Sequence, residues 1–336
     1  MKETSEAMID IVLPWVDGSD PAWRALRNKY MGESEGDSSE ERYRDWGLLK
    51  YVFRGIEKNL PWVRKVHFIT CGHLPPWLDT SCSKLQIVKH EDYIPAQWLP
   101  TFSSHPIELN IHRISGLSEQ FIYMNDDMFF VNPMAPSDFF RNGKPLSQAG
   151  MEVIHNDDLD YVGILYSDLG TINRHFDSKT VLRKTFFSFV NHRYPFRENY
   201  KTLLLAPWCV GFFPGFSFFH GPNAYLKGTF EEVWSKESER LSETCSHKFR
   251  THLDNSQCTM MWWQWCSGSI VPSGIQKKLL FLSMDKPADY LNASIKGTSC
   301  PMLCVNDKKT DKVEEKMEAV IAAFETILGE KSQFER

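Results

Sequence analysis

The chain has 336 residues, of which 42% are hydrophobic and 24% charged, a composition that is ordinary for a globular protein with a large core. The formal net charge of −5 argues against a dedicated nucleic-acid-binding protein, which would usually carry a basic face. Because residues 1–10 lack the apolar core of a signal peptide and no stretch reaches the roughly 20 apolar residues of a spanning helix, we expect a cytoplasmic protein with reduced cysteines.

The first third of the chain alternates predicted strands and helices. Residues 9–15 predict a strand, and the turn-forming residues at 16–21 predict a polar loop at its end. Residues 31–41, rich in Gly, Ser and acids, predict a mobile loop, and Asp45 is placed to cap a helix that runs to about residue 59. Strands follow at 66–70 and 85–89. This alternation predicts an α/β fold with a Rossmann-like, mainly parallel sheet flanked by helices.

A polar triplet interrupts the apolar, β-prone stretch at 121–130. Asn125, Asp126 and Asp127 follow a predicted buried strand, and the carboxyl ends of such strands are where open α/β sheets place ligands. Two adjacent carboxylates between hydrophobic flanks resist desolvation unless a cation or hydrogen-bond donors compensate. A divalent metal that holds phosphate oxygens is one explanation. A turn that caps the next helix is the alternative.

The second half of the chain is predicted to be rich in helices. Helical patterns cover residues 106–114, 157–176, 179–191, 221–234 and 254–265, and a strand is expected at 279–283. Residues 311–328 predict an amphipathic closing helix. No linker separates the halves, so we expect residues 1–150 and 151–336 to be two parts of one compact domain.

Other charged residues could join the triplet. Asp17 and Asp20 follow the first strand, and Glu108 shares a predicted helical face with His112, which Arg113 follows. The positive counterparts in the second half are His220, His247 and Arg250, and a guanidinium can clamp phosphate in a bidentate manner. For each residue alone, a surface salt bridge or a helix cap is the alternative. Glycine-rich phosphate loops and a Gly-x-Ser-x-Gly elbow are absent, so the residues indicate an α/β enzyme with an acidic metal cluster and a phosphate-containing substrate.

Four blocks of sequence resemble one known family. They are Ile9-Asp10-Ile11-Val12-Leu13-Pro14-Trp15-Val16-Asp17-Gly18-Ser19-Asp20-Pro21; the segments from Arg44-Asp45-Trp46 to Phe121-Ile122-Tyr123-Met124-Asn125-Asp126-Asp127; His220 with His247-Lys248-Phe249-Arg250 and Asp254; and Cys304-Val305-Asn306-Asp307. On these blocks the sequence is identified as a member of the Stealth family of hexose-1-phosphate transferases. Its known members include bacterial capsular and exopolysaccharide phosphotransferases.

The resemblance implies an activity. A family member moves a sugar 1-phosphate from a nucleotide-diphosphate sugar, typically UDP-linked, to a hydroxyl of an oligo- or polysaccharide acceptor. The product is a phosphodiester and the leaving group is UMP. The expected fold is the glycosyltransferase-A variant of the Rossmann-like sheet, and a peripheral association with the capsule machinery at the inner membrane is a further expectation. The alternatives are a metal-dependent glycosyltransferase that releases UDP and an inactive carbohydrate-binding subunit.

From the resemblance and the chemistry of the side chains together, we expect roles for particular residues. Expected catalytic residues are Glu108, Asp127, His220 and Arg250, with Glu108 as the base and His220 as the residue that could exchange roles with it. Expected ligands of Mg²⁺ or Mn²⁺ are Asp126, Asp127 and Asp307. Expected substrate-binding residues are Trp15, Asp17, Gly18, Asp20, His112, Arg113, Asn125, His247 and Asn306.

Overall fold

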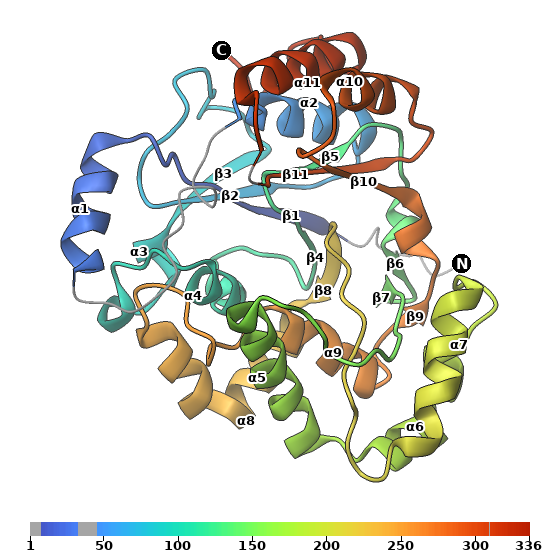
Figure 1. The fold of residues 1–336 in the computed structure, drawn as a ribbon. Helices are drawn as coiled ribbons and strands as arrows, with labels where there is room; N and C mark the ends of the chain where they lie inside the picture. Colours follow the sequence, from blue (N-terminus) through green and yellow to red (C-terminus); the bar gives the residue numbers. More distant parts are fainter. Residues whose placement is uncertain (1–7, 33–45, 309) are drawn as a thin grey trace, which may run out of the picture.

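The computed structural model describes residues 8–32, 46–308 and 310–336, and a five-stranded sheet lies at its centre (Figure 1). The strand order is β3-β2-β1-β4-β8. The strands are β1 (Ile9–Pro14), β2 (Val66–Thr70), β3 (Leu85–Lys89), β4 (Gln120–Tyr123) and β8 (Asn223–Leu226). The first four run parallel, and β8 pairs antiparallel with β4. The predicted α/β fold with a mainly parallel, Rossmann-like sheet is confirmed.

Both faces of the sheet are covered, which explains why its strands read as nearly continuous apolar runs. On β1, Ile9, Ile11 and Leu13 pack into one hydrophobic cluster, while Val12 packs into the other. Figure 1 shows α2, α10 and α11 above the sheet and α4, α5, α8 and α9 below it. A cleft that opens at the carboxyl ends of these strands can therefore receive side chains from both layers.

The helices are α1 (Pro21–Met31), α2 (Leu49–Asn59), α3 (His90–Tyr93), α4 (Ser104–Leu109), α5 (Leu159–His175), α6 (Ser178–Phe189), α7 (Phe196–Leu205), α8 (Lys227–Ser246), α9 (Cys258–Cys266), α10 (Ala288–Gly297) and α11 (Val313–Ile327). Among the described residues, no helix is both long enough and apolar enough to cross a bilayer.

Two smaller sheets complete the architecture. One has the order β10-β11-β5 and the other β6-β7-β9. Their strands are β5 (Met128–Phe130), β6 (Phe140–Arg141), β7 (Lys144–Ser147), β9 (Val271–Pro272), β10 (Leu279–Ser283) and β11 (Met302–Asn306). The stretch at 121–130 thus contains two strands, β4 in the central sheet and β5 antiparallel to β11, with the polar triplet between them. The alternative in which Asp126 and Asp127 cap a helix is wrong, because a strand follows them.

The predicted strands at 9–15, 66–70, 85–89 and 279–283 and the helices at 157–176, 179–191, 254–265 and 311–328 are confirmed, with small shifts at their ends. The predicted helix at 221–234 is wrong at its start, because Asn223–Leu226 forms β8 and pairs with the edge of β4. The helix expected at 106–114 breaks after Leu109, and a 3₁₀ turn follows at Ile111–Arg113. Asp45 and the loop residues 33–41 lie outside the described residues.

The two halves of the chain are interleaved in the sheets. The central sheet takes β8 from the second half, and β11 of the second half pairs with β5 of the first. Near the C-terminus, Glu335 forms a buried ion pair with Arg54 of α2, and Phe324 of α11 stacks on Tyr51. The division at residue 150 stays a prediction, and the packing is that of halves sharing one core.

Candidate active site

A cleft of about 550 Å³ lies at the carboxyl ends of the central strands, within the range of small-molecule sites. Trp15 follows β1, the triplet at 125–127 follows β4, and Asp307 follows β11. The polar lining comprises His90, Thr101, Ser103, Ser104, Glu108, Tyr123, Asn125, Asp126, Asp127, His220, Arg250, Asn306 and Asp307. Every residue expected to be catalytic or to bind metal lines this one cleft.

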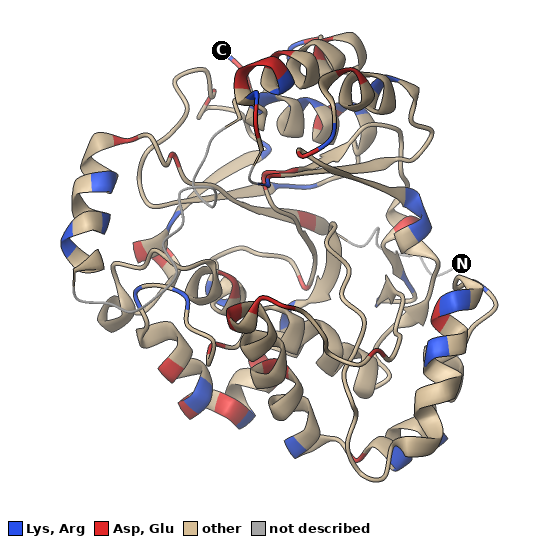
Figure 2. Cartoon of the chain, in the orientation of Figure 1, with Lys and Arg blue, Asp and Glu red and all other residues tan. Residues whose placement is uncertain are grey.

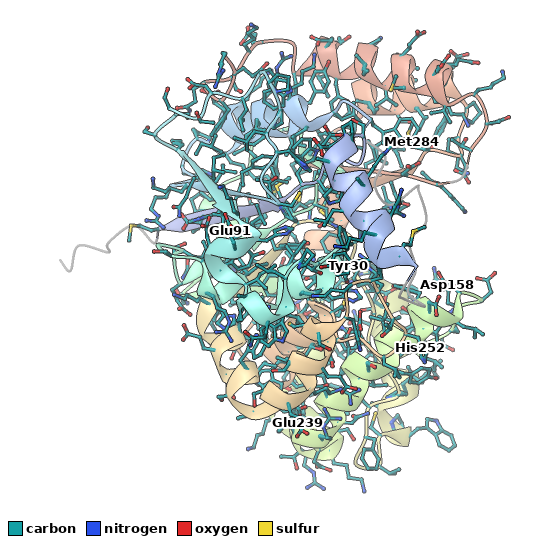
Figure 3. All side chains as sticks on the ribbon, turned by 90° about the vertical axis from the view of Figure 1, so that its left-hand side faces the viewer. Tyr30, Glu91, Asp158, Glu239, His252 and Met284 are labelled. Carbon is teal, nitrogen blue, oxygen red and sulfur yellow. The ribbon has the colours of Figure 1, made fainter. Side chains whose placement is uncertain are left out.

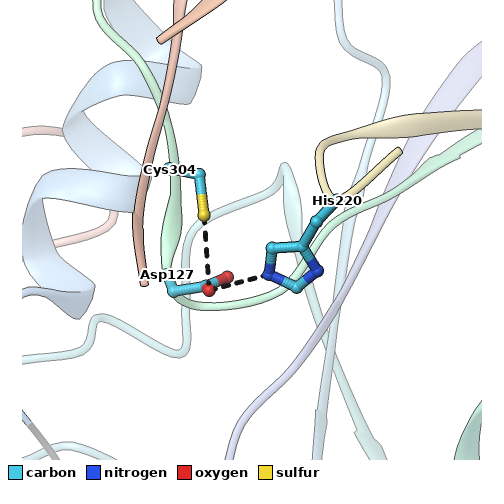
Figure 4. Close-up of side chains that lie close together, drawn as sticks. All are labelled: Asp127, His220 and Cys304. Carbon is cyan, nitrogen blue, oxygen red and sulfur yellow. Dashed lines mark hydrogen bonds and ion pairs between the residues drawn. The ribbon is translucent and has the colours of Figure 1, made fainter. Parts of the chain in front are cut away.

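Asp127 is the centre of a small cluster (Figure 4). Its Oδ2 lies 3.0 Å from Nε2 of His220 and accepts a hydrogen bond of 3.5 Å from the thiol of Cys304. The backbone carbonyl of Asp127 accepts from the N–H of Val305 at 2.8 Å, which ties the triplet to the end of β11. Oδ1 of Asp127 is buried and has no hydrogen-bond partner within the described part of the chain.

Asp127 raises the pKa of both of its neighbours, the His220 imidazole and the Cys304 thiol. Burial lowers the pKa of His220, but the hydrogen bond and negative charge of Asp127 outweigh burial, so the pKa rises above its ordinary value. Burial and the nearby Asp127 carboxylate both raise the pKa of the Cys304 thiol far above its ordinary value. Cys304 therefore acts as a thiol donor to Asp127, although its sulfur lies within 4.8 Å of the ligand atoms of Asp127 and His220.

The donor set of the cleft fits a hard divalent cation. Asp126, Asp127 and Asp307 bring carboxylate oxygens to the cleft, and Asn125 and Asn306 bring amide oxygens. Mg²⁺ and Mn²⁺ prefer such oxygen ligands, whereas zinc prefers thiolate and imidazole. The buried Oδ1 of Asp127, which has no hydrogen-bond donor within the described chain, is an atom that a cation would satisfy.

Glu108 and the triplet are joined through Tyr123. Glu108 is buried on α4, and its Oε1 lies 3.0 Å from the hydroxyl of Tyr123. The same hydroxyl lies 2.8 Å from Oδ1 of Asn125. Burial and the Glu108 carboxylate raise the pKa of Tyr123 well above its ordinary value, so the hydroxyl stays protonated. Tyr123 therefore fixes the position of Glu108 relative to the acidic turn.

Arg250 reaches the cleft from the loop between α8 and α9. Its Nη2 donates a 2.6 Å hydrogen bond to the hydroxyl of Ser104, the first residue of α4. The preceding residues hold this loop against the segment before α4, since Phe102 N–H donates to Lys248 O at 2.8 Å and the rings of Phe102 and Phe249 stack at 5.3 Å.

A buried carboxylate fastens the same loop. Asp254 accepts hydrogen bonds from Nδ1 of His105 at 2.9 Å and Nδ1 of His247 at 2.7 Å. It also accepts from the backbone N–H and the hydroxyl of Thr251. Burial raises the pKa of Asp254, but these hydrogen bonds outweigh burial and hold the pKa well below its ordinary value. Because His105 is on α4 with Glu108, Asp254 links the element that carries Glu108 to the loop that carries Arg250.

Aromatic rings form much of the remaining wall. They are Trp15, Trp23, Trp46 and Phe102. Trp15 stacks on Phe68 of β2 at 5.7 Å between ring centroids. Trp23 belongs to α1, and in the turned view of Figure 3 Tyr30 of the same helix lies near the middle of the molecule, below Met284 and above His252. Helix α1 thus contributes Trp23 to the wall of the cleft.

Three expected substrate-binding residues, Asp17, Gly18 and Asp20, are not in the cleft lining. Oδ1 of Asp17 accepts hydrogen bonds from the N–H and hydroxyl of Ser19, and Oδ1 of Asp20 accepts from the N–H of Trp23. The carbonyl of Gly18 accepts from Nε of Arg24. These contacts shape the loop after β1 and cap α1, which positions Trp15 and Trp23.

His112, Arg113 and His247 are also outside the lining. The shared helical face expected for Glu108 and His112 is wrong, because α4 ends at Leu109 and the following 3₁₀ turn redirects the chain. The His112 ring packs near Trp234, burial lowers its pKa to about 4, and the Arg113 guanidinium lies 4.9 Å from the centroid of the same Trp234 ring. His247 supports the Arg250 loop through Asp254.

Sequence reasoning assigned no role to Tyr123 or Ser104 and did not anticipate the contact of Cys304 with Asp127. Tyr123 had a usable signal, since residues two apart on an extended segment point to the same side, and Tyr123 precedes Asn125 by two. Ser104 and Cys304 had no such signal. Their roles depend on how α4 meets the Arg250 loop and on how β11 pairs with β5.

Fold and site together define an α/β enzyme with an acidic cleft at the carboxyl ends of a Rossmann-like sheet. Residues 9–35 match the family description "Stealth protein CR1, conserved region 1", and residues 42–147 match "Stealth protein CR2, conserved region 2". The galactosyltransferase LgtC, solved in complex with donor and acceptor sugar analogues, is similar with a TM-score of 0.41 and 9% identity, covering 95% of this chain and 96% of LgtC.

Curated relatives cover nearly the whole chain. The capsular polysaccharide phosphotransferase WcwK of Streptococcus pneumoniae is 36% identical over 334 residues, which are 98% of each chain. The receptor polysaccharide phosphotransferase WefC of Streptococcus gordonii is 36% identical, covering 97% of this chain and 98% of WefC. The exopolysaccharide phosphotransferase cps2G of Lactiplantibacillus plantarum is 34% identical, covering 98% of this chain and 96% of cps2G. The protein belongs to the Stealth family and is a phosphotransferase.

Proposed function

We propose that this protein transfers a sugar 1-phosphate from a UDP-sugar to a hydroxyl of a saccharide acceptor in the synthesis of a capsular or other cell-surface polysaccharide. The observation that carries the proposal is the convergence of Glu108, Asp127, His220 and Arg250 in one cleft. The names of relatives similar along the full chain support the polysaccharide product.

The positive groups of the cleft suit the diphosphate of such a donor. Arg250 is held by Ser104, and a fixed guanidinium can pair with phosphate oxygens through two parallel hydrogen bonds. His220 is oriented by its hydrogen bond to Asp127 in the acidic turn. Phosphoryl transfer is mainly positioning and charge neutralisation, so these two residues would stabilise the charge that spreads over the equatorial oxygens.

Asp126, Asp127 and Asp307 would hold Mg²⁺ or Mn²⁺. When bound, such a cation neutralises charge on the two phosphates and on the departing nucleotide. Asn125 and Asn306 lie beside these carboxylates and would orient them or the donor. The aromatic wall that includes Trp15 offers a stacking surface for the base or a sugar ring.

Glu108 is the base in this proposal. Four carboxylates line the cleft, and Glu108 is the one that is not assigned to the cation. In the transfer, Glu108 takes the proton of the acceptor hydroxyl, the acceptor oxygen forms a bond to the β-phosphorus, and the bond from that phosphorus to the bridging oxygen breaks. The leaving group is UMP, and the product is a sugar–phosphate–sugar diester. Tyr123 holds the carboxylate in place during this step.

The decisive experiment identifies the released nucleotide. Purified protein would be incubated with a panel of UDP-sugars, Mg²⁺ and saccharide acceptors, and the products separated by chromatography. The expected products are UMP and a phosphodiester, which phosphorus NMR identifies. Release of UDP would instead establish a glycosyltransferase. Binding of saccharide without turnover of any donor would indicate an inactive carbohydrate-binding subunit.

Variants test the site itself. Glu108→Gln and Asp127→Asn should each lower turnover by about 10²-fold or more, because each removes a charge that acts on the reacting atoms. Glu91→Gln is the matched control, since Glu91 is exposed on α3 and is not in the cleft lining. Near-full activity of either cleft variant would overturn the assignment.

A further inference from the structure

The region from α6 to residue 212 exposes an unusual amount of apolar surface. Among the described residues, 18 large hydrophobic side chains are exposed, and eight of them lie between residues 187 and 212. Of these eight, the most exposed are Phe196 at 83%, Trp208 at 80% and Phe187 at 78%. Scattered exposed hydrophobic residues are normal, but a concentration within 26 residues indicates a surface that meets another apolar phase or partner.

Helix α7 presents an apolar stripe to solvent. Phe196, Tyr200, Leu203 and Leu204 recur at the spacing of one helical face, and all four are at least 48% exposed. The buried residue of this helix is Thr202. A helix that packs on a core buries its apolar stripe, whereas α7 exposes its apolar stripe to solvent.

The three pieces of this region are held together by hydrogen bonds. Asn199 of α7 bonds the backbone of Asn191, just beyond the end of α6, at 2.9 and 2.8 Å. Gly211 bonds Ser178, the first residue of α6, at 3.1 and 3.2 Å. The exposed side chains of Trp208, Val210 and Phe212 therefore belong to one hydrogen-bonded unit with α6 and α7, which we call the apolar platform (residues 178–213).

The apolar platform is also basic. It contains six Lys or Arg residues and one acidic residue, Glu198, a net charge of +5. Since the whole chain carries −5, the remainder carries −10. The basic residues are Lys179, Arg183, Lys184, Arg193, Arg197 and Lys201. Figure 2 shows blue positions along α6 and α7, where the two helices lie at the lower right of the molecule.

We propose that the apolar platform docks the protein on an anionic lipid bilayer. Exposed Trp, Tyr, Phe and Leu beside Lys and Arg are the composition of segments that lie in the membrane interface, where rings enter the headgroup region and basic side chains meet lipid phosphates. A second copy of the chain fits less well, because a two-fold interface would place the +5 patch against itself. This inference goes beyond the proposed reaction and does not depend on it.

Docking through the platform leaves the cleft accessible. None of the exposed apolar residues from Phe187 to Phe212 belongs to the cleft lining. The protein can therefore bind lipid and nucleotide-sized ligands at once, and substitutions in the platform should leave the cleft unchanged.

Vesicle flotation tests the proposal with the full-length protein. Vesicles of phosphatidylcholine with about 30% phosphatidylglycerol should carry the protein to the top of the gradient, and pure phosphatidylcholine vesicles should carry much less of it. Raising the salt from about 0.1 to 0.5 M should weaken binding. The double variant Phe196→Ser/Trp208→Ser should lower the bound fraction at least about tenfold, since each side chain contributes apolar burial in the interface.

Matched controls separate the platform from general effects. Tyr290→Ser changes a half-exposed ring on α10 outside the platform and should bind like wild type. Arg193→Glu/Arg197→Glu should lose binding to anionic vesicles, whereas Lys29→Glu/Lys296→Glu, with the same charge change elsewhere, should lose much less.

Two outcomes would overturn the proposal. One is wild-type protein that fails to float with anionic vesicles at low salt. The other is a dimer, measured by sedimentation velocity, that Phe196→Ser/Trp208→Ser dissociates while vesicle binding is unchanged, because the platform would then be an interface between copies. Circular dichroism of each variant excludes unfolding as the cause.

Discussion

At the scale of single residues, Asp127 is the central residue of the cluster in the cleft. One carboxylate oxygen meets His220 and Cys304, and the other is buried without a donor within the described residues. Such an arrangement is costly for an isolated carboxylate and is typical of a ligand for a cation. Tyr123 performs the second linking role, because it joins Glu108 to Asn125.

The hydroxyl of Tyr123 gives a test of this linkage. Tyr123→Phe removes the donor between Glu108 and Asn125 without changing the ring, so turnover should fall about 10- to 100-fold, the usual cost of losing a hydrogen bond that orients a functional group. Tyr194→Phe is the control, since its hydroxyl bonds the carbonyl of Ser188 in the helix-rich half. Steady-state kinetics measures the effect. Equal losses in the two variants would contradict a specific role for Tyr123.

At the scale of elements, two segments distant in sequence are fastened at Asp254. Helix α4 carries His105 and Glu108, and the loop before α9 carries His247 and Arg250. Asp254 accepts hydrogen bonds from both segments while fully buried. The relative position of Glu108 and Arg250 therefore depends on a residue that lies outside the cleft lining.

Asp254→Asn should weaken the contact between α4 and the loop that carries Arg250. The variant breaks a buried, charge-assisted network, so the free energy of unfolding should fall by about 3 kcal/mol, and turnover per folded molecule should also fall. Asp10→Asn serves as the control, because Asp10 forms a buried network with Arg64 and His67 near the start of β1, away from the cleft. Urea denaturation and kinetics below the melting temperature give both quantities. Loss of stability with unchanged turnover would show that Asp254 does not position the site.

The Asp10 network predicts a pH dependence of stability. Burial raises the pKa of Asp10, but hydrogen bonds from His67, Arg64 and Ser118 outweigh burial and lower the pKa to about 2 from 3.8. A lowered pKa means that the carboxylate stabilises the fold above pH 3.8, by about 2 kcal/mol, and that this contribution is lost as the pH falls towards 2.

Urea denaturation of wild type and Asp10→Asn at pH 7, 5 and 3 measures this dependence. The difference in unfolding free energy should be largest at pH 7 and 5 and smaller at pH 3. Glu91→Gln, a surface variant, should show no such trend. A difference that is constant across the three values would exclude the ionised Asp10 as its source.

At the scale of the whole molecule, the cleft depends on both halves of the chain. Its acidic turn belongs to the first half, while His220, Arg250 and Asp307 belong to the second. The halves share the central sheet and the β10-β11-β5 sheet. Unfolding of either half must therefore destroy the site, and a ligand of the cleft should stabilise the whole chain.

Because the two halves share these sheets, a ligand of the cleft should raise the melting temperature of the whole chain. Mg²⁺ with UDP should raise the melting temperature of a single transition, and at about 100 times the dissociation constant the gain should approach 2.7 kcal/mol. EDTA should reverse the effect of Mg²⁺, and Asp127→Asn should abolish it. Asp79→Asn, a change at a partly exposed residue outside the cleft lining, is the control. A shift that survives in Asp127→Asn would place the cation elsewhere.

The sequence by itself determined the fold class and the residue types of the site. Apolar runs of strand length at 9–15, 66–70 and 85–89 can be satisfied only by burial on both faces of a sheet, and local pattern carries that information. The adjacent carboxylates at 126 and 127 also gave a local signal. The free-energy cost of burying two neighbouring charges can be inferred from the sequence without knowing what they contact. The family motifs supplied the expectation of a phosphotransferase.

The tertiary structure decided which of those residues meet. Nothing local distinguishes β8 at Asn223–Leu226 from the start of a helix, because its strand character comes from pairing with β4. Likewise His112 shares a helical face with Glu108 only if α4 continues past Leu109, and α4 ends there with Asn110 as its C-cap. The roles of Tyr123, Cys304 and Asp254 come from contacts with residues of other segments. The spacing of residues along the chain does not predict such contacts.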